Sequence, residues 1–392
     1  MKKVATLVVL LVFAVSLGIT QAIAADEIDE SKLSPEAKAL KERYDKKIEE
    51  LQGEFKKEME DLCSRMDEYE GKSGAAAAGK WYDNITINGY LQARYRHFDY
   101  DENRWPIVNN QQLRDQFYIP RLYVNFISQL NNKTKAVLTL QRGGATNSGA
   151  DWANVFVEYN FDDIWSARFG QAQHNFGIDM RESSSERLPV ERAGFATGGG
   201  GLRGGFADAW DRGIWVTRKG CSKAEPDVIL GLFNGEWRNV AADGSVGYSV
   251  DARWNFDWGF AGVSWVDSHI WDAVNGTQPR EMFGLHARYL GIPRWRFQGE
   301  WVTGTVGTVG GQNQDADGWY LQAAHEIPSM PGIVFARYDE WDAGQATNDY
   351  KALHLGYRHQ LTALDELTLQ YTDADLGSAA ANEAVFQYQR RF

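Results

Sequence analysis

Cysteine is scarce in this sequence, and the common motifs for binding metals or haem are missing. Of 392 residues only Cys63 and Cys221 are cysteines, which excludes a scaffold built on disulfides. The two are open to two interpretations, a disulfide with each other or two separate thiols. No C-x-x-C-H, H-E-x-x-H or C-x-x-C motif occurs, so we expect no covalent haem and no other cofactor or metal.

Long hydrophobic runs are absent beyond the N-terminus. The apolar run over residues 4–19 follows Lys2 and Lys3 and precedes small residues up to Ala25, which predicts a secretory signal peptide over residues 1–25. An uncleaved membrane anchor is the alternative, but the run is short for a helical span of ~20 residues. No later stretch approaches that length, which argues against further membrane-spanning helices.

Lysine is rare after residue 80. Residues 81–392 hold five Lys against 23 Arg, and their 37 acidic residues give this part a net charge of −9. Overall acidity argues against a nucleic-acid partner. Arginine rather than lysine therefore carries the positive charge, and its planar guanidinium binds carboxylate and phosphate oxygens through two parallel hydrogen bonds.

One helix is expected before the main part of the chain. Apolar residues recur every three or four positions, and Leu33, Tyr44, Phe55 and Met66 lie eleven apart, which predicts a nearly straight or slightly right-handed coiled coil. We interpret residues 26–70 as a periplasmic coiled-coil helix that self-associates; an amphipathic helix lying on another surface is the alternative. The small residues of 71–80 predict a flexible linker.

From residue 81 onward the hydrophobic period is two. In the stretch VGYSVDARWNF, for example, Tyr248 and Val250 alternate with Ser249 and Asp251. Sixteen such segments occur, and strands are expected to begin near Ile85, Phe117, Thr134, Trp152, Trp165, Arg212, Asp227, Val246, Gly259, Met282, Trp295, Gly318, Ile333, Tyr350, Glu366 and Ala384.

The connections between these segments alternate between short turns and long loops rich in Gly, Asn and Asp. Together with an even number of alternating strands, this predicts an all-β fold over residues 81–392, a transmembrane β-barrel of sixteen antiparallel strands in the bacterial outer membrane. The barrel must close because lipid cannot satisfy an open sheet edge. A soluble, secreted all-β protein with aromatic side chains in its core is the alternative.

Aromatic residues mark the ends of the segments. The candidates for interfacial girdles are Trp81, Trp152, Trp165, Trp258, Trp295 and Trp341. The final stretch, AVFQYQRRF, places Phe386, Tyr388 and Phe392 on the outward face and ends on an aromatic residue. It resembles the C-terminal signature of bacterial outer-membrane proteins, which implies outer-membrane lipid around the barrel and the barrel-assembly machinery as a partner through Phe392. Arg390 departs from the apolar pattern and can snorkel at the interface.

Alternation also sorts the charged side chains that face the lumen. The expected pore-lining arginines are Arg94, Arg96, Arg121, Arg168, Arg253, Arg288, Arg296, Arg337, Arg358 and Arg391. Fewer acids share this face, namely Glu158, Asp251, Glu300 and Asp339. Rings of Arg and Lys build anion pores. The alternative is that these arginines pair with neighbouring acids and only fill a polar lumen.

Three stretches resemble the phosphate-selective porin O and P family: PRLYVNFISQLNNKTKAVLTLQ, VEYNFDDIWSARFGQAQHNFGIDMRESSSERLPVERA and DRGIWV. The motif-like part runs from Pro120 to Val216. The resemblance implies a homotrimeric, anion-selective pore with an arginine ladder and a periplasmic lysine cluster. It also implies that the strand ending in Gly170-Gln171 leads into an inward-folded constriction loop. The few lysines depart from this pattern, so an anion pore is better supported than phosphate itself.

The third loop, the long stretch without alternation before Trp210, is where a constriction is expected. Its site residues are Arg181, Glu182, Ser183, Ser184, Ser185, Glu186, Arg187, Glu191 and Arg192. The arginines would form a positive side facing Arg94, Arg121 or Arg168 on the wall. The glutamates would form the other side or pin the loop through ion pairs.

These features predict a non-enzymatic porin, a passive diffusion channel for small anionic solutes such as phosphate or organic acids. Two alternatives remain. One is the barrel scaffold of a porin–cytochrome electron conduit, in which a partner supplies the cofactors. The other is a structural porin whose periplasmic coil tethers the outer membrane to the cell wall.

Overall fold

The structure, a computed structural model, describes Lys46 and residues 84–100, 115–142, 151–196, 210–235, 246–272, 276–307, 313–342, 349–376 and 379–392. The chain divides into two compact units, residues 1–80 and 81–392. Apart from Lys46, which is helical, the expected signal peptide, coiled coil and linker lie outside the described residues, as do Cys63 and Trp81. Within the described residues, no helix is long and apolar enough to cross a membrane.

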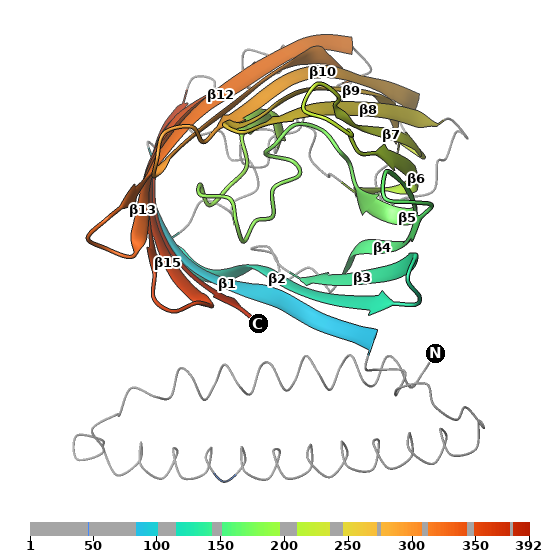
Figure 1. The fold of residues 1–392 in the computed structure, drawn as a ribbon. Coiled ribbons are helices and arrows are strands. Elements are labelled where there is room, and N and C mark those ends of the chain that lie inside the picture. Colours follow the sequence, from blue (N-terminus) through green and yellow to red (C-terminus); the bar gives the residue numbers. More distant parts are fainter. Residues whose placement is uncertain are drawn as a thin grey trace. The chain divides into compact units, whose positions relative to one another are not determined.

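The described part of the second unit forms a closed barrel of sixteen antiparallel strands (Figure 1). Each strand pairs with its neighbours in sequence, and β1 pairs with β16 to close the ring. The strands are β1 (Ile85–Tyr100), β2 (Gln116–Gln129), β3 (Thr134–Arg142), β4 (Asp151–Asn160), β5 (Trp165–Gln173), β6 (Trp210–Arg218), β7 (Asp227–Phe233), β8 (Gly247–Phe256), β9 (Gly259–Asp272), β10 (Gly276–Tyr289), β11 (Trp295–Gly307), β12 (Asn313–Ile327), β13 (Gly332–Asp342), β14 (Tyr350–Gln360), β15 (Asp365–Leu376) and β16 (Ala379–Arg391).

Period-two alternation gives the barrel its two faces. On β8 the inward Ser249 and Asp251 are buried, whereas the outward Tyr248 and Phe256 are exposed. Ring closure leaves no sheet edge, since the backbone groups of β1 are paired with those of β16 along eleven cross-strand positions. The predicted sixteen-stranded barrel is confirmed. An apolar face on the outside is the arrangement of a membrane barrel rather than of a soluble protein with an aromatic core.

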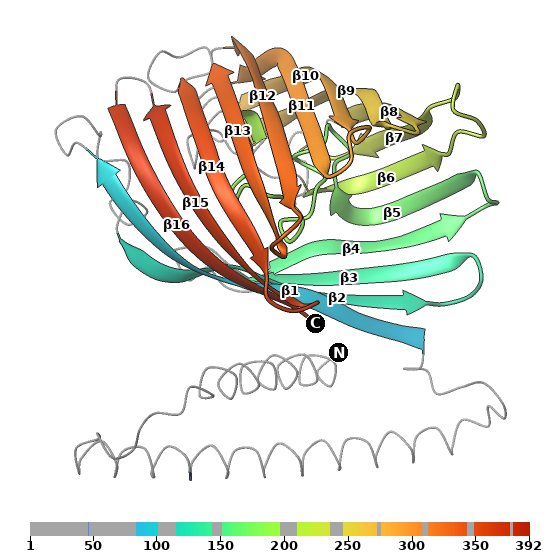
Figure 2. The same cartoon turned by 60° about the vertical axis from the view of Figure 1, so that its left-hand side comes forward.

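One rim of the barrel carries the short turns and both ends of the barrel chain (Figure 2). The last residue, Phe392, exchanges backbone hydrogen bonds with Gly89 at 3.0 and 3.1 Å. Short turns mark the periplasmic rim of such barrels, and long loops mark the external rim. Arg390 lies on the outward face near the periplasmic rim and forms an ion pair with Asp365 at 3.1 Å.

Four of the expected girdle tryptophans are exposed on the outward face: Trp152, Trp165, Trp258 and Trp295. The expectation for Trp341 is wrong. Its side chain is 1% exposed and belongs to the apolar cluster between the wall and the third loop. It shares the inward face of β13 with Asp339, two positions away. The other cysteine, Cys221, is an exposed thiol in the turn between β6 and β7, and its pairing with Cys63 stays an open interpretation because Cys63 lies outside the described residues.

Candidate functional site

The third loop leaves the wall after β5 and runs inside the ring of strands, where residues 174–196 are described (Figure 1). Its hydrogen bonds reach strands on several sides, among them β1, β11 and β16. The loop is therefore a lumenal element and not an external flap.

An apolar cluster fixes the loop against the wall. Phe176, Met180 and Phe195 of the loop are at most 2% exposed and pack with inward residues of the strands, among them Met282 and Tyr320. The Phe195 ring stacks on the Tyr320 ring at 6.2 Å between centroids. Burying these side chains removes apolar surface from lumenal water, which stabilises the loop.

A carboxylate on β11 holds the first turn of the loop. Glu300 accepts the backbone N–H groups of Ile178 at 2.8 Å and Asp179 at 2.5 Å, and the Tyr320 hydroxyl at 2.7 Å. Gly177 lies so close to this carboxylate that a Cβ there would be 1.9 Å from a Glu300 oxygen. Its φ of 60° also belongs to the left-handed region that favours glycine.

Arg181 and Glu182 of the loop pair with charges on the wall and not with each other. Arg181 forms an ion pair with Asp251 of β8 at 2.7 Å, and Glu182 forms one with Arg288 of β10 at 2.7 Å. Arg181 and Glu182 are neighbours in sequence, but the first is paired with an acid of the wall and the second with an arginine of the wall. Of the two roles expected for the loop glutamates, Glu182 therefore has the second, which is to hold the loop through an ion pair.

Glu191 is the most shared carboxylate in the lumen. Its oxygens contact Arg94, Arg121 at 3.0 Å and Arg96 at 3.9 Å. Burial alone would raise the pKa of Glu191, but the guanidinium groups of Arg121, Arg94 and Arg96 hold it well below its ordinary value. The group therefore stays ionised across the neutral and mildly acidic range.

The three serines contribute mainly through their backbone. The Ser184 carbonyl accepts a hydrogen bond from Gln92 of β1 at 2.9 Å, and the Ser185 carbonyl accepts others from Gln389 and Arg391 of β16 at 3.0 and 2.7 Å. The Ser183 hydroxyl lies 2.9 Å from that of Ser185 and remains exposed. The segment 184–185 thus bridges the strands that close the barrel.

Two arginines, Arg358 and Arg187, donate hydrogen bonds to main-chain oxygens of the loop. Arg358 donates to the carbonyls of Glu186, at 3.2 Å, and Leu188, at 3.4 Å. Arg187 is 1% exposed and donates to the carbonyls of Pro189 and Val190 at 3.2 and 3.3 Å. Burial, with Arg192 nearby, lowers the pKa of Arg187 to about 9, so it remains charged at neutral pH. The Glu186 side chain lies exposed above this segment.

The wall beyond the loop has its own charge pairs. Arg168 and Lys135 share Glu158 at 2.9 and 2.8 Å on β3 to β5. Arg337 lies 3.0 Å from Asp339 and 3.5 Å from Asp179 of the loop. Further pairs of predicted arginines are Arg96 with Glu383 and Arg253 with Asp227, the second at 3.6 Å. Arg358 and Arg391 both pair with Glu366, at 3.5 and 3.4 Å.

The structure therefore brings the predicted loop residues together with most of the predicted wall arginines. Among the described residues, Arg296 stands without a carboxylate within ion-pair distance. Four further residues of the site were not predicted from the sequence: Asp179, which accepts the Ala193 N–H at 2.8 Å, and the inward glutamines Gln92, Gln370 and Gln389. Their signal was present, because glutamine recurs at inward positions of β1, β15 and β16, the strands around the closing seam.

Solved structures of similar fold include a porin, an outer membrane channel and an outer membrane protein. An anion-selective porin from Comamonas acidovorans has a TM-score of 0.60 at 12% identity, covering 79% of this chain and 99% of that one. The outer membrane channel DcaP of Acinetobacter baumannii has a TM-score of 0.56 at 10% identity, covering 79% and 97%. The trimer form of OmpT from Vibrio cholerae has 0.55 at 12%, covering 79% and 99%. At such identities the likeness concerns the fold.

Fold and lumenal loop together define an outer-membrane porin, a channel-forming barrel. The family model described as phosphate-selective porin O and P matches residues 91–261, which confirms the resemblance found in the sequence over that part. No match is found among the curated proteins.

Proposed function

We propose that this porin is a passive diffusion channel for small anionic solutes, such as phosphate or organic acids, and that the third loop forms its constriction. The observation that carries this is the shortage of carboxylates around lumenal guanidinium groups. Glu191 serves three arginines, whereas Arg296, Arg187 and Arg192 have no carboxylate within ion-pair distance among the described residues. Such uncompensated charge attracts anions into a pore, because selectivity follows the local field.

The solute path in this proposal runs between the loop and the wall of β3 to β5. Lys135 and Arg168 on that wall keep 35% and 31% of their side-chain surface exposed. Arg181 on the loop keeps 23%, so basic groups with accessible surface occur on both elements. Glu186 supplies an opposing exposed charge and would limit the preference for anions to a moderate one.

The test is the reversal potential of the purified porin in planar bilayers under a KCl gradient. The proposal predicts a reversal potential with the sign of an anion-selective channel. The size of this potential should fall in Arg296→Gln, because no carboxylate neutralises the charge of this arginine. A cation-selective sign would contradict it. Glu186→Gln is the matched variant and should shift the potential the opposite way.

An electron conduit is less well supported, since the loop occupies the lumen that a redox partner would need. We further propose a homotrimer and a periplasmic position for the N-terminal helix, either as an oligomer staple or as a cell-wall tether. Deleting residues 25–80 and measuring trimer stability and envelope integrity separates these two roles.

A further inference from the structure

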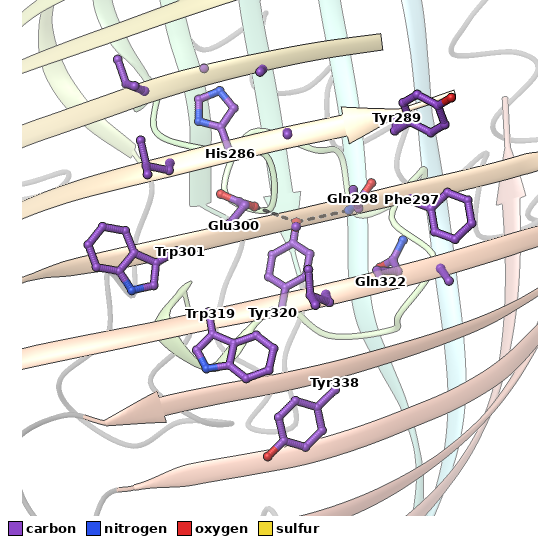
Figure 3. Close-up of a pocket in the computed structure, with 18 of the residues that line it drawn as sticks. His286, Tyr289, Phe297, Gln298, Glu300, Trp301, Trp319, Tyr320, Gln322 and Tyr338 are labelled. Carbon is purple, nitrogen blue, oxygen red and sulfur yellow. Dashed lines mark hydrogen bonds between the residues drawn. The ribbon is translucent and has the colours of Figure 1, made fainter. Parts of the chain in front are cut away.

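The membrane-facing wall of β8 to β14 is hollowed by a trough of about 1110 Å³. Figure 3 shows Trp301 and Trp319 toward one end of these strands and Tyr289 and Phe297 toward the other. Trp301 and Tyr289 are 41% and 40% exposed, so they stand on the outward face and not in the lumen.

Small residues form the floor of the trough. Ala287 of β10 is the cross-strand partner of Ala261 on β9 and of Gly299 on β11. On the next two strands, Ala323 of β12 is the cross-strand partner of Ala336 on β13. Because the residues that flank this floor along the strands are mostly large and aromatic, the wall is depressed where the small residues lie.

The floor lies in the periplasmic half of the wall. Ala261 is the third residue of β9, and Ala287 is two residues before the end of β10, so both are close to the short turns. Short turns face the periplasm in barrels of this kind. The trough is therefore accessible from the inner leaflet of the outer membrane.

The two ends of the trough differ in charge. At the periplasmic end Arg294 is exposed in the turn between β10 and β11, and the exposed Glu326 donates its backbone N–H to the Arg294 carbonyl at 2.9 Å. At the external end, outward Asp317 pairs across the strands with Asp342. An anionic headgroup is attracted at the periplasmic end and repelled at the external one.

We propose that the trough binds an acyl chain of an anionic glycerophospholipid from the periplasmic leaflet, with the lipid phosphate beside Arg294. The apolar floor and aromatic walls match a flexible hydrocarbon chain. The guanidinium supplies the phosphate contact, for which its planar donors are suited. The proposal concerns the outer surface and is independent of the ion selectivity of the lumen.

The test uses the full-length porin in nanodiscs of phosphatidylethanolamine with a minor share of phosphatidylglycerol that carries a diazirine on one acyl chain. After illumination, labelled peptides are mapped by mass spectrometry. We expect labelling of residues 295–301 and 319–338 above that of the outward surface around Ala136 on β3. Ala323→Trp, which fills the trough, should reduce it to the Ala136 level.

Ala136→Trp is the matched control, because Ala136 lies at a similar height on the outward face and should leave trough labelling unchanged. Arg294→Gln should lower labelling by the phosphatidylglycerol probe more than by a phosphatidylethanolamine probe of the same chain. Labelling no higher than at Ala136, or unchanged in Ala323→Trp, would overturn the proposal. Zero-length cross-links between two porin chains through the trough would also overturn it and assign the surface to a second copy. Heat-modifiable migration in gels verifies that each variant is folded.

Discussion

The Glu300 carboxylate on β11 and the backbone N–H of Ile178 in the third loop are joined by a hydrogen bond of 2.8 Å. A side chain of the barrel wall thus holds the main chain of the loop, at the point where the loop first turns into the lumen. The same carboxylate accepts the Asp179 N–H, so one residue fixes two consecutive peptide groups. The position of this first turn therefore depends on one buried carboxyl group.

Glu300→Gln should loosen the loop. The amide can accept one of the two N–H groups, but its own NH₂ then faces the other, so one buried hydrogen bond worth about 0.5–1.5 kcal/mol is lost. Single-channel recordings should show larger current noise and more frequent conductance steps than wild type. Glu281→Gln, on the outward face of β10, is the control. Recordings of both variants that match wild type would argue against this anchor.

Glu191→Gln should make the channel more anion-selective. The change removes the one carboxylate shared by Arg94, Arg96 and Arg121 while keeping the side-chain volume. Reversal potentials in a KCl gradient should shift toward the chloride potential. Glu158→Gln provides the comparison, since two cations share that carboxylate instead of three. A shift toward cation selectivity in Glu191→Gln would be incompatible with this interpretation.

The selectivity contributed by Glu191 should resist acid. Because neighbouring guanidinium groups keep its folded-state pKa well below the ordinary 4.5, its charge and its hold on the loop are present above that value. Both are lost only as pH falls through the lower pKa. Acidifying the bilayer chamber from pH 7 to about pH 4.5, the ordinary value, should therefore not reproduce the effect of Glu191→Gln. A titration of selectivity centred there and abolished in Glu191→Gln would contradict the prediction.

Gly177→Ala should destabilise the folded barrel. A methyl group would lie 1.9 Å from a Glu300 oxygen, and φ at this position is 60°. The backbone conformation alone costs about 1 kcal/mol, and displacing Glu300 adds to it. The unfolding temperature from heat-modifiable gel migration should fall. Gly291→Ala is the control, because the nearest atoms to its Cβ belong to the exposed Tyr289 side chain, which can move aside. Equal melting of both variants would show that the contact with Glu300 is unimportant.

Alternation in the sequence was sufficient to predict the barrel, because lipid on one side and water on the other impose a period of two on each strand. Most predicted strand starts agree with the structure, but β10, β12 and β16 begin earlier, at Gly276, Asn313 and Ala379. Their first residues extend from the long-loop end and are polar or small. Where a strand extends past the membrane, neither of its faces contacts lipid. Hydrophobic alternation is therefore absent, and the sequence does not show where the strand begins.

The site was less predictable for a related reason. Residue types indicated a charged loop, but which loop charge meets which wall charge depends on the path of the loop, and alternation says nothing about that path. Trp341 shows the same limit. Its position near a strand end favoured a membrane girdle, and only the packing of the loop against β13 reveals why a large aromatic residue points inward.

The carbonyls of Ser184 and Ser185 hold glutamines on β1 and β16, which are the first and last strands of the ring. Those two strands are far apart in the chain and meet only when the sheet curls shut. The loop thus links the first and last strands of the barrel. Its hydrogen bonds to both strands are complete only when β1 and β16 are paired. We therefore expect insertion of the loop and closure of the barrel to be coupled during folding, because these hydrogen bonds are complete only after both have occurred.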